Sequence, residues 1–403
     1  MGYDVKAVRA HFPALDEGAA HFDGPGGSQV PDVVADAVAG TLRSAIANRG
    51  SVTKAERRAD AIVGEARQAA ADLVGGTPDG VVFGRSMTAL TYDLARALAK
   101  QWRAGDEVIV TRLDHDANIR PWVHAAQASG ATVRWADFDG GTAELAVEAV
   151  TDLLSQRTRV VAVSGASNLI GTRPDVPAIA AAAHAAGALV YVDGVHLTPH
   201  AFVDMAALGA DFFACSPYKF LGPHLGLVAA HPEVLETVHP DKLLPMPDAV
   251  PDRFEQGTLP YELLAGTTAA VDFLAGLVPG SGSRRERLRA SMAALEEHEA
   301  ALRSRLEDSL SGLPGVVLHG SRSRRRTPTV LFSVDGVPPR AAYEHLGARG
   351  VNAPAGTFYA VECARTLGLG DAGAVRAGIG PYTDDSDVDR LVDAVAELVR
   401  QPR

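Results

Sequence analysis

The chain has 403 residues, of which 47% are hydrophobic, enough to bury a sizeable core in one large and one smaller domain. Its formal net charge of -11 argues against non-specific binding to nucleic acid. With only two cysteines, Cys215 and Cys363, no disulfide framework is implied. The N-terminus shows no signal peptide and no apolar run is long enough for a membrane span, so we expect a cytoplasmic protein without nucleic-acid or membrane partners.

Between about residues 80 and 230, short β-branched runs alternate with alanine-rich stretches of helical spacing. The expected strands lie within residues 80–84, 106–114, 131–139, 158–167, 188–196 and 210–216. The expected helices lie within residues 88–102, 117–130, 144–156 and 175–187. This alternation predicts an α/β fold with a mainly parallel sheet covered on both faces.

The pattern changes near residue 279, where a polar Gly/Ser-rich stretch leads into a long charged helix at residues 285–313. Two strand-like runs (315–320 and 327–334), a helix near 340–350 and a last helix at 385–400 follow. We therefore predict a large domain over residues 16–278 and a smaller α+β domain over 279–403, on which residues 1–15 pack. The basic run at 321–327 is expected to be a solvated loop rather than a binding patch.

In a parallel sheet of this kind, ligands bind beyond the carboxyl ends of the strands, so the residues that follow each strand matter most. Ser86, Met87 and Thr88 stand at the turn from the first strand into a helix, where free backbone N–H groups favour a phosphate. Either Ser86 or Thr88 also suits a simple helix cap, and the turn alone does not separate the two readings.

Polar residues that suit more than one role follow the second and the fourth expected strand. His115 and Asn118 follow the second strand, and Asn168 follows the fourth. A histidine in a loop is often only hydrogen-bonded, and asparagine is a good turn residue, so structural roles stay open for these positions.

The fifth and sixth strands are more informative. Asp193 closes an apolar strand, where a buried carboxylate needs a cationic or hydrogen-bonding partner, although an N-cap role is the simpler alternative. His196 follows it by three positions, and Lys219 follows the next strand among aromatic and turn residues. A lysine in a partly apolar cleft has a lowered pKa and can form a Schiff base with an aldehyde. Together with a phosphate-binding turn, these are the parts that a pyridoxal phosphate site requires.

At this point the chain resembles a known family, the fold-type I pyridoxal phosphate enzymes of the class V aminotransferase group, and within it the cysteine desulfurase-like proteins. The resemblance runs over essentially the whole chain. It rests on the ordered motifs "FDGPGGSQVP", "DHDANIRPW", "SNLIGT", "VDGVHLTPH", "SPYKFLGPHLG" and "FEQGTLP".

The resemblance implies a role for individual residues. Lys219 would hold the cofactor aldehyde, Asp193 would pair with its pyridine nitrogen, and His115 would stack on its ring. Arg376 would bind the substrate carboxylate, with Asn118 as a second substrate contact. The remaining cofactor contacts would be Asn168, His196, Met87, Thr88, Ser216 and Tyr218, with Thr258 reaching the phosphate of the neighbouring subunit of a homodimer. No metal site is expected.

One departure from the family concerns the reaction. Family desulfurases carry a catalytic cysteine on a loop whose counterpart here, "GTFYAVEC", places Tyr359 at that position. Cys363 lies four residues further on at what reads as the start of a helix, and Cys215 lies in an apolar run, so both are interpreted as structural.

We therefore expect an enzyme that breaks a bond at Cα or Cβ of an amino acid, with Lys219 as general base and His115 or Tyr359 as proton donor. Elimination at the C–S bond of cysteine or of a cysteine S-conjugate is the preferred reaction. A cysteine or selenocysteine desulfurase, an isopenicillin N epimerase-like isomerase, a transaminase and a catalytically silent binding protein are the alternatives. The sequence does not identify the substrate side chain.

Overall fold

The computed structural model describes residues 2–321 and 326–400. In this part of the chain the central element is a seven-stranded sheet with the order β2-β8-β7-β6-β5-β3-β4. Its strands are β2 (Val81–Gly84), β3 (Glu107–Thr111), β4 (Thr132–Ala136), β5 (Thr158–Ser164), β6 (Leu189–Asp193), β7 (Phe212–Cys215) and β8 (Gly226–Ala230). Strand β8 runs antiparallel to both β7 and β2, and the other pairings are parallel. The mainly parallel α/β fold is therefore confirmed.

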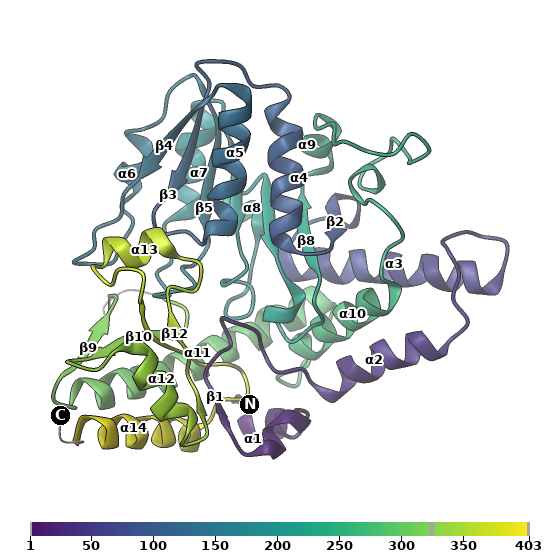
Figure 1. The fold of residues 1–403 in the computed structure, drawn as a ribbon. Helices are drawn as coiled ribbons and strands as arrows, with labels where there is room; N and C mark the ends of the chain where they lie inside the picture. Colours follow the sequence, from purple (N-terminus) through teal and green to yellow (C-terminus); the bar gives the residue numbers. More distant parts are fainter. Residues whose placement is uncertain (1, 322–325, 401–403) are drawn as a thin grey trace.

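Helices cover both faces of this sheet (Figure 1). Neighbouring strand residues point to opposite faces, so Val190 and Val192 join one apolar cluster while Tyr191 between them joins the other. The first face is covered by α3, α7, α10 and the first part of α11, and the second by α4 and α5. The bounds are α2 (Asp32–Arg43), α3 (Lys54–Val74), α4 (Met87–Ala99), α5 (Arg120–Ser129), α6 (Val147–Thr151), α7 (Val176–Ala185), α8 (Met205–Leu208), α9 (Pro232–Glu236), α10 (Tyr261–Ala275) and α11 (Arg284–Ser311).

The C-terminal part forms a smaller antiparallel sheet with the order β12-β13-β10-β9 in the described residues. Its own apolar cluster includes the second part of α11 together with α12 and α14. The elements are β9 (Val316–His319), β10 (Thr329–Val334), α12 (Pro339–Gly347), β11 (Val351–Asn352), β12 (Ala355–Gly356), α13 (Val361–Thr366), β13 (Ala374–Gly378) and α14 (Asp385–Arg400).

The N-terminal residues lie against this smaller unit. Helix α1 (Val5–Arg9) brings Arg9 within 2.6 Å of Asp387, and the Tyr3 hydroxyl donates to the Pro381 carbonyl. Strand β1 (Ala20–His21) pairs in parallel with β11. Residues 20–21, which the sequence assigned to the large domain, thus pair with a strand of the C-terminal part. The rest of the division into two domains stays a prediction.

Local sequence explains where the long helices begin. Thr53 caps α3 and Ser283 caps α11, and in each case a glutamate three residues later bonds back to the backbone of the capping residue. Each such capping box satisfies N–H groups that a helix start otherwise leaves free. The Gly/Ser-rich stretch before residue 284 is therefore a helix start, as the pattern predicted.

Three local predictions need correction. The helix expected over residues 144–156 is only α6, because Ser155 bonds to Thr158 and Glu107 and turns the chain into β5. Strand β8 was not predicted. The basic run was expected to be solvated, and its residues 322–325 lie outside the described residues, but Arg326 is buried and pairs with Glu307.

Candidate active site

A cavity of about 480 Å³ lies at the carboxyl ends of the central strands. One wall comes from the turns after the strands of the large sheet, and the other comes from the smaller unit through Pro354, Phe358, Tyr359 and Arg376. Eleven of the residues predicted from the sequence line it. They are Met87, Thr88, His115, Asn168, Asp193, His196, Ser216, Tyr218, Lys219, Tyr359 and Arg376.

Lys219 stands in the short 3-10 turn Pro217–Lys219 that follows β7. Its ammonium donates to the Pro25 carbonyl and lies 4.8 Å from the ring centre of Tyr218. Burial and the nearby Arg376 lower the pKa of Lys219 to about 7, while Asp23 and Asp193 oppose this shift. Near neutral pH the side chain is therefore available as a neutral amine, the form that attacks an aldehyde.

Asp193 ends β6 and is buried. One carboxylate oxygen accepts from the Val195 backbone N–H at 2.9 Å. Burial raises the pKa of Asp193 to about 6, against the opposing effects of that hydrogen bond and of Lys219. A buried carboxylate at this position suits a cationic ring nitrogen, which would lower its desolvation cost.

His115 caps the 3-10 turn after β3, and its Nδ1 accepts from the Ala117 backbone N–H at 3.0 Å. This bond assigns the proton of the neutral ring to Nε2. Burial, followed by the charges of Lys219 and Arg376, lowers the pKa of His115 to about 4. Its ring lies 5.5 Å from the ring of Tyr359. The histidine is thus a neutral ring with one N–H donor in the cavity wall.

The turn from β2 into α4 forms the opposite end of the site. Ser86 caps the helix by accepting from the Ala89 backbone N–H at 3.1 Å, so the capping role considered for this residue is observed. Met87 and Thr88 begin the helix and face the cavity, as do Ser216 and Tyr218 from the turn after β7. A Cβ on Gly226 would lie 2.1 Å from the Ser86 carbonyl carbon, so the backbone fixes this turn tightly. Free N–H groups and hydroxyls at a helix N-terminus form a phosphate cradle.

Arg376 lies on β13 and is fully enclosed. Its guanidinium donates to Asp23 Oδ1 at 2.8 Å and to the Asn168 carbonyl at 3.1 Å, and it lies 3.7 Å from the ring centre of Phe358. Burial lowers the pKa of Arg376 to about 10, which leaves it charged at neutral pH. It is therefore an anion-binding group inside the cavity.

Asn168 and His196 complete the polar wall. Asn168 Nδ2 donates to the Phe358 carbonyl at 3.0 Å, and its Oδ1 is buried without a hydrogen-bond partner among the described residues. His196 Nε2 lies 2.9 Å from the Thr329 hydroxyl, and burial lowers the pKa of His196 well below its usual value. The orphaned amide oxygen is a group that a bound ligand would satisfy.

Asn118 does not belong to this wall, and its predicted substrate contact is wrong. It is fully buried, donates to Asp114 Oδ1 at 2.6 Å and accepts from Trp122 Nε1 at 3.2 Å. Both polar groups of its amide are thus used inside the core. Thr258 is exposed and lies outside the lining residues of this chain, so its predicted role toward a neighbouring subunit stays a prediction.

Sequence reasoning missed Asp23 and Phe358, both of which contact Arg376. Asp23 stood inside the quoted motif "FDGPGG", which was a usable signal, but only the fold brings it to Arg376. Phe358 and Tyr359 are consecutive non-glycine residues with positive φ values of 53° and 59°. Such a conformation is costly and concentrates at functional loops.

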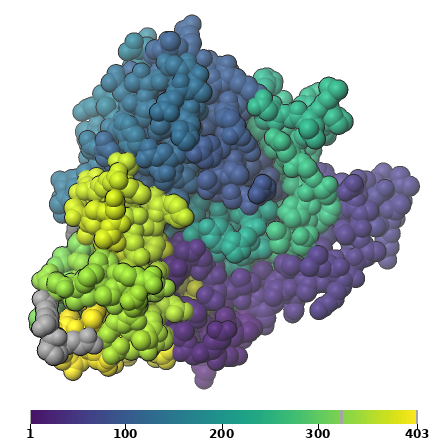
Figure 2. Space-filling view, viewed as in Figure 1, coloured from purple at the N-terminus to yellow at the C-terminus, as the bar shows by residue number. Residues whose placement is uncertain are grey.

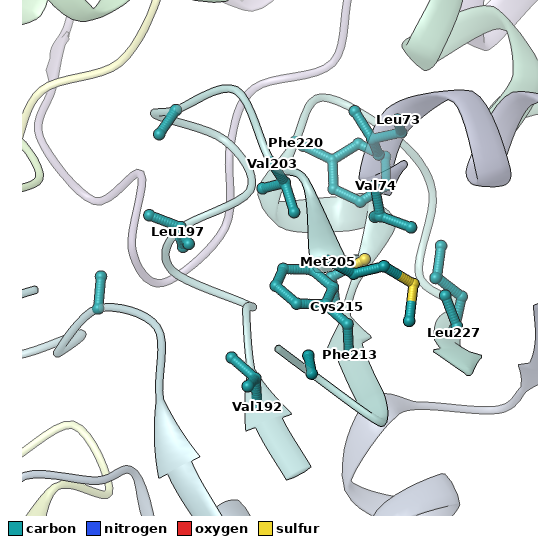
Figure 3. Close-up of a cluster of buried hydrophobic side chains, with 14 of the residues drawn as sticks. Leu73, Val74, Val192, Leu197, Val203, Met205, Phe213, Cys215, Phe220 and Leu227 are labelled. Carbon is teal, nitrogen blue, oxygen red and sulfur yellow. The ribbon is translucent and has the colours of Figure 1, made fainter. Parts of the chain in front are cut away.

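Both cysteines are buried and lie outside the residues that line the cavity in the described chain. Cys215 is packed among apolar side chains that include Phe213, Met205 and Leu227 (Figure 3). Cys363 lies in α13, and burial raises the pKa of its thiol to about 12. Neither thiol is therefore an accessible nucleophile in this structure.

The donor set fits one cofactor. The cavity has a suitable size and is lined by five kinds of group: a lysine of lowered pKa, a buried carboxylate, a neutral ring, a phosphate cradle and an amide oxygen without a hydrogen-bond partner in the described chain. These are the groups that would hold the aldehyde, ring nitrogen, ring face and phosphate of pyridoxal phosphate. Among the described residues, no cluster of His, Cys, Asp and Glu is arranged to hold a metal ion, and no helix is long and apolar enough to cross a bilayer.

Comparisons with known proteins agree with this site. The sequence pattern of the family described as Aminotransferase class-V matches residues 20–391. An uncharacterized protein of Mycobacterium tuberculosis, MT3887, is 38% identical over 99% of this chain and 100% of its own length. A probable cysteine desulfurase of Pseudomonas aeruginosa is 31% identical, covering 97% of this chain and 98% of that protein.

Among solved structures, the cysteine desulfurase CsdA of Escherichia coli superposes with a TM-score of 0.86 at 27% identity, over 98% of each chain. The apo cysteine desulfurase of Thermococcus onnurineus gives a TM-score of 0.90 at 24% identity, over 99% of each chain, and shares the fold. The chain therefore belongs to the class V aminotransferase family, and pyridoxal phosphate is its cofactor.

Proposed function

We propose that this protein is a lyase that cleaves the C–S bond of cysteine or of a cysteine S-conjugate by β-elimination, without a persulfide on the enzyme. Similarity to cysteine desulfurases supports C–S cleavage of an amino acid in general. The observation that carries the finer proposal is Tyr359, which lines the cavity on the loop where the resemblance expects a cysteine. With Cys215 and Cys363 both buried, no thiol reaches the cavity in the described chain to accept sulfur.

The overall reaction would convert a cysteine S-conjugate and water into a thiol, pyruvate and ammonium. When bound, pyridoxal phosphate supplies an electron sink for the pair released at Cα. Lys219 would hold the cofactor's aldehyde carbon before the substrate binds, and its amine would then accept the Cα proton. The lowered pKa of Lys219 supports this role, because a free amine with an ordinary pKa would be protonated at pH 7.

The leaving sulfur needs a proton donor. His115 carries its proton on Nε2, and the Tyr359 hydroxyl belongs to the adjacent ring. Tyr359 is 74% exposed, so its side chain has room to turn toward a bound substrate. We assign the protonation of the thiolate to one of these two groups.

The test follows sulfide or thiol, alanine and pyruvate separately after the purified protein is incubated with cysteine, selenocysteine and bulky S-conjugates. Pyruvate and free thiol in equal amounts are expected. Alanine with enzyme-bound persulfide would instead establish a desulfurase, and an amino acid of inverted configuration would establish an epimerase. Lys219→Ala is the control, since it should lose both product formation and the chromophore that borohydride traps.

We also propose that the protein works as a homodimer with shared active sites. Thr258 is exposed, and α2 with the loop after it exposes Val33, Leu42 and Val52. The loop after α9 exposes Leu244, and it projects from the same side of the molecule as α2 and α3 (Figure 2). Exposed apolar side chains gathered on one side are typical of an interface, and a second copy is the occupant that the role of Thr258 requires.

Light scattering should give twice the monomer mass. Thr258→Ala should weaken cofactor binding without changing that mass, because its hydroxyl would reach only the phosphate of the partner. A monomer of full cofactor affinity would contradict the proposal. The cytoplasmic location expected from the sequence stays a prediction.

A further inference from the structure

The anion-binding arginine of the cavity already has an internal carboxylate partner. Asp23 Oδ1 accepts from Arg376 Nη2 at 2.8 Å, although the Asp23 side chain is 44% exposed and lines the cavity. Arg376 is 2% exposed, so the two charges meet where the guanidinium is enclosed and the carboxylate faces the opening. A carboxylate that enters the cavity therefore meets Asp23 at the position it would occupy.

Two further groups of the chain contact Arg376 beside Asp23. Nη1 donates to the Asn168 carbonyl at 3.1 Å, and Nε is buried without a partner among the described residues. The ring of Phe358 covers one face of the guanidinium. A substrate carboxylate that binds at Nη2 thus gains a charge-assisted bond at the expense of Asp23.

The chain beside Asp23 leaves space for its carboxylate at this place. A Cβ on Gly26 would lie 2.3 to 2.5 Å from the carboxylate atoms of Asp23, so residue 26 must be glycine for the carboxylate to fit. The neighbouring Pro25 carbonyl accepts from Lys219, and the charge of Asp23 acts on that amine. Asp23 therefore lies between the arginine and the place where an incoming amino group must react.

We propose that Asp23 is a specificity-determining residue that recognises the α-ammonium group of the substrate by exchanging ion pairs. The substrate carboxylate replaces Asp23 on Arg376, and the released Asp23 carboxylate pairs with the substrate ammonium beside Lys219. The inference rests on the proposed amino-acid substrate but is independent of which bond is cleaved.

The exchange explains why a zwitterion is favoured over a simple carboxylic acid. A carboxylic acid without an amino group would release Asp23 from Arg376 and supply no cation to replace that partner. A zwitterion supplies both charges, so the number of ion pairs in the cavity rises from one to two. Charge-assisted bonds of this kind contribute enough free energy for a preference of about tenfold or more.

The test measures binding to the borohydride-reduced holoenzyme, in which the cofactor is fixed to Lys219 and ligands bind without reacting. Calorimetry compares S-methyl-L-cysteine with 3-(methylthio)propanoate, which has the same skeleton without the amino group. The unchanged protein should bind the amino acid at least about tenfold more tightly. Asp23→Asn should reduce this preference to within about twofold and should bind the propanoate more tightly than the unchanged protein does.

Gly26→Ala provides a second route to the same result, because its Cβ would displace the Asp23 carboxylate without removing it. Asp116→Asn is the matched control. This carboxylate lines the same cavity but pairs with Arg120, so the preference should persist. Retention of the tenfold preference in both Asp23→Asn and Gly26→Ala, or its absence from the unchanged protein, would overturn the inference. A preserved preference in a protein that cleaves no cysteine derivative would instead refute the proposed function alone.

Discussion

The lowered pKa of Lys219 has a measurable effect on the stability of the cofactor-free protein. Burial and Arg376 bring this pKa from 10.5 to about 7. Between these two pH values the unfolded chain keeps a proton that the folded chain has lost, so stability rises with pH across that range. Below pH 7 the folded protein carries the whole cost of a buried ammonium.

The size of this cost follows from the same two values. At about 1.4 kcal/mol for each tenfold change, the difference corresponds to at most about 5 kcal/mol. Water and polar groups around the cavity relax toward the charge, so we expect about 2–4 kcal/mol to be measurable. Lys219→Met keeps an unbranched side chain that is one atom shorter and removes the titrating amine. The variant should therefore exceed the unchanged apo protein in stability by that amount at pH 6.

The assay is denaturant unfolding of both proteins without cofactor at a series of pH values from 6 to 10.5. The difference between their free energies of unfolding should decrease as pH rises above 7 and should be nearly zero at pH 10.5. Other titrating groups are common to both proteins and cancel in the comparison. A difference that is constant across the series would show that the lysine has an ordinary pKa, and the argument for Lys219 as a neutral amine would fail.

Three further changes test other parts of the structure. Gly226→Ala should force the turn at Ser86 away from β8 and so lower the affinity for the cofactor at least about tenfold, as measured by titration of the apo protein. An unchanged affinity would refute the argument that the backbone at residue 226 fixes this turn. Glu299→Gln should destabilise the protein by about 3 kcal/mol, because Glu299 is buried at 3.0 Å from His200, and an unchanged melting temperature would count against this pair. Tyr359→Phe should lower kcat for conjugates with poor leaving groups more than for those with good ones if the hydroxyl protonates the sulfur, and equal effects would leave His115 as the donor.

Much of the site follows from the order of strands in the sequence. Asp193 and Lys219 could be predicted because the carboxyl ends of parallel strands lie at the same edge of the sheet, where ligands bind. Both residues lie at or just after the end of an apolar strand. The assignment of Arg376 came from the resemblance. Its strand belongs to the smaller sheet, and strand periodicity does not show how one sheet packs against the other.

Asn118 shows the limit of that reasoning. A position three residues after His115 looked equally close to the site, but the short helical turn directs its side chain into the core toward Asp114. In a helical turn, neighbouring residues point in different directions, and a one-dimensional spacing does not fix which of them faces the cavity.

The α/β class, the positions of the parallel strands and the lysine and aspartate at their ends could be predicted from the sequence, because strand periodicity is a local property of the chain. Two contacts became evident only in the folded chain: Asp23 reaches Arg376, and Tyr359 lines the cavity beside His115. These contacts join residues that are hundreds of positions apart. They depend on how the small unit packs against the large sheet, which is a property of the whole folded chain.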